Sequence, residues 1–311
     1  MEKDNRDTLV KSRSARAVIA DGYGLYAGSF KHVFKRSWAE AVAYAAAYAL
    51  LGIVSLDVTP RLAALTIAAE SGAVDARSAL TTWMALTGRQ TVCLLLFVLA
   101  AIAIAACGFA ALREHKATGR IGDSKWLPTF DRHTGWRTLK GICCAGVLTA
   151  VVFAIAVAAS LVAAKFLSPM ASSVLLLILM MVACVVALPI VYVLTDYVLN
   201  DGKAFWRNLT TSYQTGIRHW GFIFVVQLMA NLVLMIATFF TSLPASILTL
   251  ANVQANLGVL NGDPLGMPDG IMWLTAAVFV VAGFVQAYVH LSVLFPTYFM
   301  YGSIEASTIE K

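Results

Sequence analysis

The sequence predicts an all-α membrane protein: a polytopic bundle of about six transmembrane helices, with amphipathic helices at the membrane interface. Of the 311 residues, 59% are hydrophobic and only 13% are charged, far from the usual composition of a soluble domain. The charges are also segregated, because Lys165 is the only charged residue between Gly141 and Thr195. These neutral stretches lack the alternation of apolar and polar residues that marks the strands of a membrane barrel.

Six stretches are long and apolar enough to cross a ~30 Å hydrocarbon layer as helices, which takes about 20 residues each. Residues 1–20 are expected to form a flexible cytoplasmic tail, residues 21–303 a single transmembrane domain, and residues 304–311 a C-terminal tail in the cytoplasm. The predicted spans are residues 39–57, 91–112, 141–164, 172–198, 221–243 and 271–299.

The positive residues predict an orientation. With these spans, 19 of the 23 Lys and Arg residues lie on the side of the two termini and four lie on the other side. Because positive residues are retained in the cytoplasm, both termini are predicted to be cytoplasmic in a plasma membrane such as a bacterial inner membrane. The net charge of +6 then lies beside the membrane. It predicts anionic lipid head groups as partners and argues against nucleic acid.

Two segments on the predicted cytoplasmic side have the pattern of amphipathic interfacial helices. In residues 25–37 and 204–219, aromatic and aliphatic side chains recur every three to four positions and cations occupy another face,. A weaker third copy starts at Asp123, Lys125 and Trp126. The chain is interpreted as three repeats of a surface helix and a transmembrane hairpin, or else as the usual recurrence of Trp and basic residues beside spans. The predicted interfacial anchors are Trp38, Trp136, Trp220, Phe30, Phe34, Lys31, Lys35 and Arg36.

On the opposite side, Thr59 and Pro60 are predicted to cap and begin a short surface helix, and Asp75 is predicted to cap a second one. The last segment on this side is predicted to turn at residues 261–264, which are Asn, Gly, Asp and Pro,. These segments are the candidates for contacts outside the cytoplasm.

The alternation of an aromatic and basic segment, a Trp at the membrane edge and an apolar span is carried by Tyr26 to Trp38 and by Phe205 to Trp220. It resembles a loose group of uncharacterised bacterial multi-span families, such as the membrane domain attached to some glycerophosphodiester phosphodiesterases. The resemblance implies a membrane architecture. It does not imply the phosphodiesterase activity, because this chain has no room for the soluble catalytic domain of those proteins.

The sequence lacks the motifs that mark metalloproteases, P-loop enzymes and Gly-x-Ser-x-Gly hydrolases. Its five cysteines fall within predicted spans without metal-ligand spacing, so we expect no disulfide, metal or cofactor. The deep polar residues are Gln227 and Asn231 on one face of the fifth span, and Gln286 and His290 on one face of the sixth. At ~1.5 Å per residue, Asn231 and His290 lie level in the membrane, so we expect them to hydrogen bond directly or through one water.

These features predict a non-enzymatic integral membrane protein that organises or assists other membrane components. In that case the four deep polar residues are helix–helix contacts. The alternative is a small-solute transporter or permease, in which they form a polar site between spans five and six. An intramembrane enzyme has less support, because acid–base catalysis needs positioned titratable groups that these spans lack.

Overall fold

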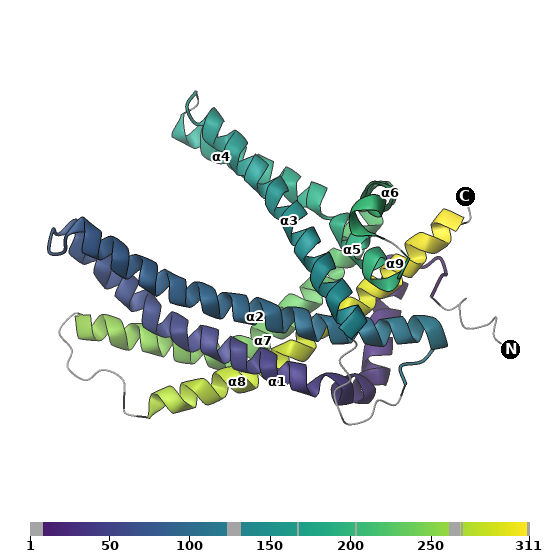
Figure 1. Cartoon of the computed structure of the whole chain (residues 1–311), viewed down its shortest axis with the longest axis horizontal. Helices are drawn as coiled ribbons and strands as arrows, with labels where there is room; N and C mark the ends of the chain where they lie inside the picture. Colours follow the sequence, from purple (N-terminus) through teal and green to yellow (C-terminus); the bar gives the residue numbers. More distant parts are fainter. Residues whose placement is uncertain are drawn as a thin grey trace. The chain divides into compact units, whose positions relative to one another are not determined.

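The computed structural model describes residues 9–122, 132–166, 168–202, 204–260, 268 and 270–309. Within these ranges the chain is helical and contains no strand, as the sequence predicts (Figure 1). The helices are α1 (Ala15–Glu70), α2 (Ala76–Thr118), α3 (Arg132–Ala163), α4 (Pro169–Ala187), α5 (Ile190–Leu199), α6 (Phe205–Arg218), α7 (Trp220–Leu260), α8 (Ile271–Ser292) and α9 (Leu294–Ile309).

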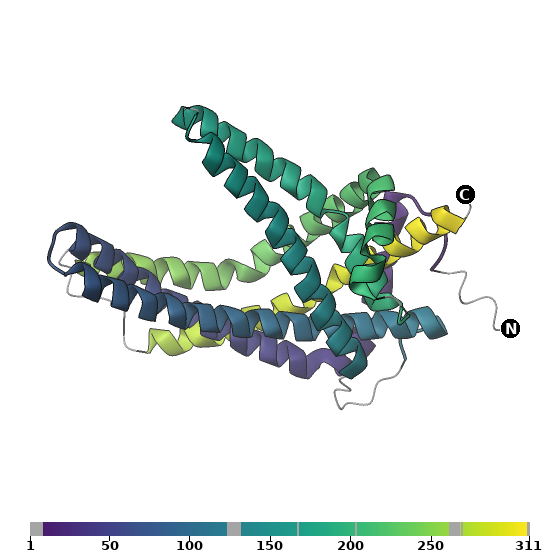
Figure 2. The same ribbon diagram turned by 45° about the horizontal axis from the view of Figure 1, so that its top comes forward.

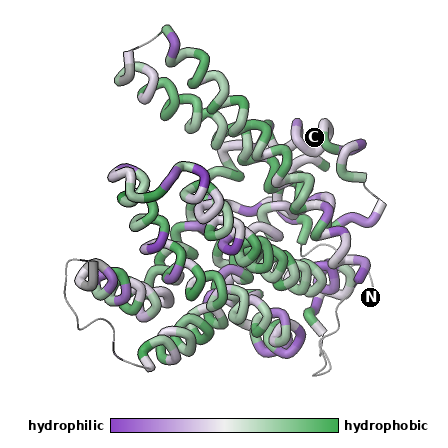
Figure 3. Tube along the Cα trace, turned by 60° about the vertical axis from the view of Figure 1, so that its left-hand side comes forward, coloured by the Kyte–Doolittle hydropathy of each residue, from purple (hydrophilic) through white to green (hydrophobic). Residues whose placement is uncertain are grey.

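Six helical stretches are long and apolar enough to cross a membrane, as in a multi-pass membrane protein. Apart from residue 164, they contain all six predicted spans. Figure 3 shows long hydrophobic runs in the helices, with hydrophilic residues between them. The stretches are Ala15–Glu70, Ala76–Thr118, Arg132–Ala163, Met170–Leu199, Trp220–Asn256 and Ile271–Ile309.

Three helices are much longer than the predicted spans. α1 has 56 residues, α2 has 43 and α7 has 41, whereas about 20 cross the hydrocarbon layer. The prediction that a new helix begins at Thr59 and Pro60 is wrong, because α1 continues through Pro60. Proline removes one backbone hydrogen bond, but its fixed φ is compatible with helix, so the chain needs no break there.

Asp75 caps a helix as predicted, but the prediction that this helix is short is wrong, because α2 continues to Thr118. The Asp75 carboxylate accepts a hydrogen bond from the backbone N–H of Ser78 at 3.2 Å, and α2 begins at Ala76. Hydrogen bonds from the hydroxyl and backbone N–H of Ser78 hold the pKa of the Asp75 carboxyl below its usual value. The residues of the predicted turn at 261–264 lie outside the described residues.

Prolines do divide two of the spanning stretches. Pro189 separates α4 from α5, since a proline inside a helix cannot donate to the preceding turn,. Pro296 lies one turn after the end of α8, and the Thr297 hydroxyl donates to the carbonyl oxygen of Val293 at 3.0 Å. The fourth and sixth predicted spans therefore each consist of two helices.

The chain forms two compact units. The single domain predicted over residues 21–303 stays a prediction. The first unit comprises residues 1–36, 105–232 and 292–311, and the second comprises residues 37–104 and 233–291. Helices α1, α2 and α7 contribute one segment to each unit. Each unit is therefore assembled from segments that are far apart in the sequence.

In the first unit, α9 is a buried helix. The side chains of Phe295, Tyr298 and Met300 have no exposed surface. Gly22 of α1 allows a close approach to α9, because a Cβ at Gly22 would lie 2.6 Å from the backbone of Pro296. This contact anchors the start of α1 to α9.

The predicted tails are shorter than expected. α1 begins at Ala15 and α9 continues to Ile309, so parts of both predicted tails are helical. Leu9 and Ile304 are buried, and the backbone N–H of Arg13 donates to Ser303 Oγ at 2.9 Å. The apolar residues at each end of the chain bury their surface against the other end. This burial stabilises helical structure in segments whose polar composition predicted flexible tails.

The helices α3 and α4 form an antiparallel hairpin in the first unit and lie side by side in both views (Figures 1 and 2). The hydroxyl of Ser168 caps α4 by accepting from the backbone N–H of Ala171. At the other end of α3, a Cβ at Gly141 would lie 2.8 Å from Cδ1 of Leu194. The absence of a side chain at Gly141 therefore lets α3 approach α5.

In the second unit, small residues bring α1, α7 and α8 together. Ala49 of α1, Ala245 of α7, and Phe279 and Ala282 of α8 form a buried cluster. A Cβ at Gly283 would lie 3.0 Å from the Cα of Ala45 on α1. Small residues at such contacts let helix backbones approach closely, which is how helices associate in lipid.

The two predicted interfacial helices differ in the structure. Residues 204–219 largely form α6, a separate helix that ends one residue before α7. Residues 25–37 are also helical, but they belong to α1 and continue directly into the span. The distinguishing residues of the third copy, Asp123, Lys125 and Trp126, lie outside the described residues.

Candidate functional site

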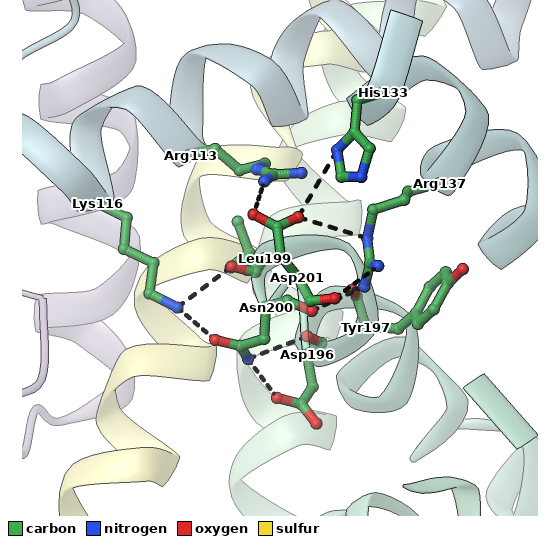
Figure 4. A network of polar contacts seen from close by, with 9 residues as sticks. All are labelled: Arg113, Lys116, His133, Arg137, Asp196, Tyr197, Leu199, Asn200 and Asp201. Carbon is green, nitrogen blue, oxygen red and sulfur yellow. Dashed lines mark hydrogen bonds and ion pairs between the residues drawn. The ribbon is translucent and has the colours of Figure 1, made fainter. Parts of the chain in front are cut away.

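A dense polar network surrounds the carboxyl end of α5 in the first unit (Figure 4). Because α5 ends at Leu199, its last carbonyl oxygens have no partner within the helix,. Arg137 of α3 donates to the carbonyl oxygens of Tyr197 at 2.5 Å and Asn200 at 2.7 Å. Lys116 of α2 donates to the carbonyl oxygen of Leu199 at 3.3 Å. Cations placed here satisfy the free carbonyls and oppose the negative end of the helix dipole.

Asp201, just beyond α5, has basic partners from two helices. Arg113 of α2 forms an ion pair with its carboxylate. Arg137 Nε lies 3.9 Å from the other carboxylate oxygen, and His133 Nδ1 lies 3.7 Å from it. The Asp201 side chain is 59% exposed, so this part of the network lies at the surface.

Asp196 forms the buried centre of the network, with 1% of its surface exposed. Its carboxylate accepts hydrogen bonds from Asn200 Nδ2 at 2.7 Å, Ser212 Oγ at 2.7 Å and the Tyr301 hydroxyl at 3.3 Å. A void of about 10 Å³ next to Asp196 is lined in part by Asn208. That volume accommodates about one water molecule.

The network extends to α9 through tyrosines. The Tyr192 hydroxyl donates to Glu305 at 2.5 Å. The Lys116 ammonium lies 5.8 Å from the ring centroid of Tyr301, and the Arg137 guanidinium lies 4.4 Å from that of Tyr197. Three cations and three carboxyl groups thereby join α2, α3, α5, α6 and α9 within one unit.

Two of the predicted deep polar residues meet in the first unit. Gln227 Nε2 donates to Thr297 Oγ1 at 3.1 Å, which links α7 to α9. Asn231 Nδ2 donates to the carbonyl oxygen of Gln227 at 2.8 Å. Gln227 therefore forms a contact between helices, whereas the hydrogen bond of Asn231 stays within α7 and Asn231 is exposed.

The other two deep polar residues belong to the second unit. Gln286 is buried, and His290 Nδ1 lies 2.8 Å from the carbonyl oxygen of Gln286, one turn earlier in α8. Because Asn231 and His290 lie in different units, the hydrogen bond expected between them stays a prediction.

The predicted tryptophan anchors are partly exposed. Trp136 is 57% exposed, and the Lys140 ammonium lies 5.0 Å from its ring centroid. Trp220 stacks on Phe224 and donates from Nε1 to the carbonyl oxygen of Val185 at 3.1 Å. Trp38 is 38% exposed. These residues have the exposed surface that an interfacial anchor requires.

The remaining predicted anchors lie in the first half of α1. Phe30 is exposed and its ring is 5.7 Å from that of Tyr26 and 6.1 Å from that of Phe34, while Lys31 is also exposed. Lys35 is partly buried. Arg36 donates to Glu114 of α2 at 2.8 Å. Arg36 therefore acts within the first unit, although the sequence predicted that it faces the interface.

Sequence reasoning missed most of the network around α5. Arg113, Lys116 and Arg137 were counted only as cytoplasmic charges, and nothing in the sequence pairs them with residues near position 200. A signal existed in Asp196 and Asn200, which share a helix face at the end of an apolar stretch. Polar groups four residues apart at such an end indicate a local hydrogen bond, but they do not identify a distant partner.

Among the residues that the structure describes, no three His, Cys, Asp or Glu side chains are grouped as a metal site requires. The network instead pairs carboxyl groups with cations and hydroxyl donors, an arrangement that holds helices together. Comparisons of the chain with models of protein families, with curated proteins and with solved structures found no match.

Proposed function

We propose that this chain is a multi-pass protein of the bacterial inner membrane that organises or assists other membrane components without catalysing a reaction. The observation that carries the proposal is the hydrogen bonding of Asp196, whose carboxylate accepts from three protein groups. Buried polar groups that are satisfied in this way specify a fold. The charged residues of the first unit thus support a scaffold.

The proposal includes anionic lipid as a partner on the cytoplasmic side, where both termini lie. Its support is α6, on which Phe205 is buried, Trp206 and Ile217 are exposed apolar residues, and Arg207 and Arg218 are exposed cations. A helix with exposed apolar and cationic faces is suited to lie between hydrocarbon and head groups. Each cation near an anionic surface contributes about 1 kcal/mol of attraction.

The orientation is tested by labelling single introduced cysteines in intact cells with a membrane-impermeant reagent. We expect Arg77→Cys to be labelled and Lys125→Cys to be protected until the membrane is opened. Labelling of residue 125 in sealed cells would place the basic segments outside and reject the orientation.

The lipid partner is tested in proteoliposomes by energy transfer from the protein's tryptophans to pyrene-labelled phosphatidylglycerol or phosphatidylcholine with matched acyl chains. We expect stronger transfer to phosphatidylglycerol. The double change Arg207→Gln and Arg218→Gln should weaken this preference by about fivefold per charge, which is roughly 1 kcal/mol each. Arg77→Gln, on the opposite side, is the control. Equal transfer to both lipids would reject the proposed partner.

The same proteoliposomes test the transporter alternative. In an osmotic swelling assay with small neutral solutes, we expect the wild-type rate to equal that of protein-free liposomes. Gln227 and Asn231 are already hydrogen bonded within the first unit, which favours a structural role. Protein-dependent swelling that Asn231→Leu abolishes without lowering stability would establish transport and overturn the scaffold proposal.

A further inference from the structure

A cavity of about 560 Å³ opens in the second unit between α1, α7 and the beginning of α8. Ile53 and Leu56 of α1 line it, as do Ile271 and Met272 of α8. A volume of this size, with mostly apolar walls and a few polar groups, is typical of sites for small organic ligands. The cavity is separate from the polar network, which lies wholly in the first unit.

The charged cluster at the polar wall of the cavity contains one carboxylate and two guanidinium groups, of which Arg61 lines the cavity itself. Asp57 and Arg61 both line it, and Arg61 Nη2 lies 2.8 Å from Asp57 Oδ1. Arg89 of α2 forms an ion pair with the other oxygen of the same carboxylate. One carboxylate is thus shared by two guanidinium groups. Because Arg61 is 63% exposed and has five N–H donors, it retains donors for an anion.

Two amides of α7 complete the polar wall. Asn256 Nδ2 donates to Asn252 Oδ1 at 2.8 Å and to the Asn252 carbonyl oxygen at 2.9 Å. Both side chains line the cavity and are half-buried. In the described parts of the chain, Asn252 Nδ2 donates to no protein atom. It is therefore a second donor available to a ligand.

An apolar groove of about 350 Å³ lies further along the same two helices, α7 and α8. Phe240 and Pro244 line it from α7, and Val278 and Val281 line it from α8. At ~1.5 Å per residue, Pro244 lies about 12 Å along α7 from Asn252. An acyl chain attached to a head group in the cavity is long enough to reach this groove.

We propose that the second unit binds one anionic phospholipid, with its phosphate at Arg61 and Asn252 and one acyl chain in the groove between α7 and α8. Arginine binds phosphate oxygens with two parallel N–H groups, which gives both strength and orientation. A phospholipid is the occupant that the two sites favour together, because it carries an anionic head and an apolar chain in one molecule. This site is distinct from the basic surface of α6.

The proposal is tested by native mass spectrometry of the detergent-purified full chain with dioleoyl phosphatidylglycerol or dioleoyl phosphatidylcholine. We expect one phosphatidylglycerol to be retained at a concentration at least fivefold lower than phosphatidylcholine. Arg61→Gln should abolish this preference, whereas Arg77→Gln, which removes one charge from the same unit outside the cavity, should leave it unchanged. Equal losses in the two variants would show diffuse attraction and overturn the site.

The apolar part is tested by filling the cavity without changing its charge. Ala64 lines the cavity and Ala63, its neighbour in α1, does not. Ala64→Trp should reduce retention of phosphatidylglycerol about as much as Arg61→Gln does. Ala63→Trp should leave retention unchanged. If Ala64→Trp fails to fold, Ala64→Leu is used in its place. Complete displacement of the lipid by an equal concentration of inorganic phosphate would show an anion site without a chain and overturn the proposal.

Discussion

The two units hold their helices together in different ways. In the first unit, charged and hydroxyl groups from five helices meet around the end of α5, with Asp196 buried at their centre. In the second unit, small residues such as Ala49, Ala245 and Gly283 bring helix backbones close together. The ion pairs of Asp57 in that unit involve partly exposed side chains.

The difference follows from where the helices end. The first unit contains the short helices α5, α6 and α9, and each helix end leaves backbone groups without partners,. Cationic and hydroxyl side chains satisfy those groups. In the second unit α1, α2, α7 and α8 run uninterrupted for long distances, so close packing of small residues is sufficient. The dense polar network of this chain accompanies broken helices; glycine contacts occur in both units, and in the second unit they join continuous helices.

The largest effect is expected at the centre of the first unit. Asp196→Leu should lower the free energy of unfolding by about 3–5 kcal/mol, because it leaves the buried hydroxyl groups of Ser212 and Tyr301 without their carboxylate acceptor and removes one of the acceptors of Asn200,. Unfolding of the purified protein in mixed micelles measures the change. Asp196→Asn, which keeps one acceptor oxygen, should cost less. A loss below about 1 kcal/mol for the leucine variant would contradict a structural role for the network.

A smaller effect is expected where small residues hold the second unit together. Gly283→Leu should destabilise by about 1–3 kcal/mol, because its side chain would overlap the backbone at Ala45. Gly24→Leu is the matched control: it also lies within a helix, but a Cβ there would meet no atom within 4 Å. Both variants replace a helical glycine by leucine and so gain the same helix propensity. The difference between their unfolding free energies therefore reports the packing at Gly283. Equal effects would contradict close contact at Gly283.

The deep amide of the first unit gives the next effect. Asn231→Leu should lower stability by about 0.6–1 kcal/mol, the lower part of the range for hydrogen bonds between membrane helices, because the bond of Asn231 stays within α7,. The change removes the donation to Gln227 but leaves the bond from Gln227 to Thr297 in place. Thermal unfolding in detergent measures the loss of stability. Leu232→Asn, at the next residue of α7, is the control for changing an exposed side chain. An unfolding midpoint that does not change would show that the amide is not a structural contact.

Much of this architecture follows from composition and hydrophobic length. The six apolar stretches predict the long helices, and the spacing of Phe205, Leu209 and Tyr213 predicts the separate helix α6. Asp75 is recognisable as a cap because its effect is local: its partner Ser78 is three residues away. Features set by neighbouring residues in the chain were therefore accessible to prediction.

Features set by distant residues were not. Nothing near Arg137 indicates that it binds the carbonyl oxygens around residue 200, and nothing near Leu9 indicates that it packs against the other end of the chain. Lys and Arg beside a span have a sufficient explanation in membrane orientation. The sequence prediction therefore treated them as surface charges, whereas Arg113, Arg137 and Lys116 bind the end of α5.

The smallest effect is expected at the ion pairs of the second unit. Asp57→Asn should change the unfolding free energy by at most about 1 kcal/mol, because exposed pairs are screened by solvent and salt. The side chain of Asp57 is 31% exposed and those of its partners Arg61 and Arg89 are more so. The effect of Asp57→Asn should fade as salt is raised. The effect of Asp196→Leu should persist, since that carboxylate is buried away from bulk solvent and its ions,. A loss at Asp57 as large as that at Asp196 would mean that its pairs are shielded in the membrane. In that case the second unit would also depend on a polar network, and the contrast between the two units would fail.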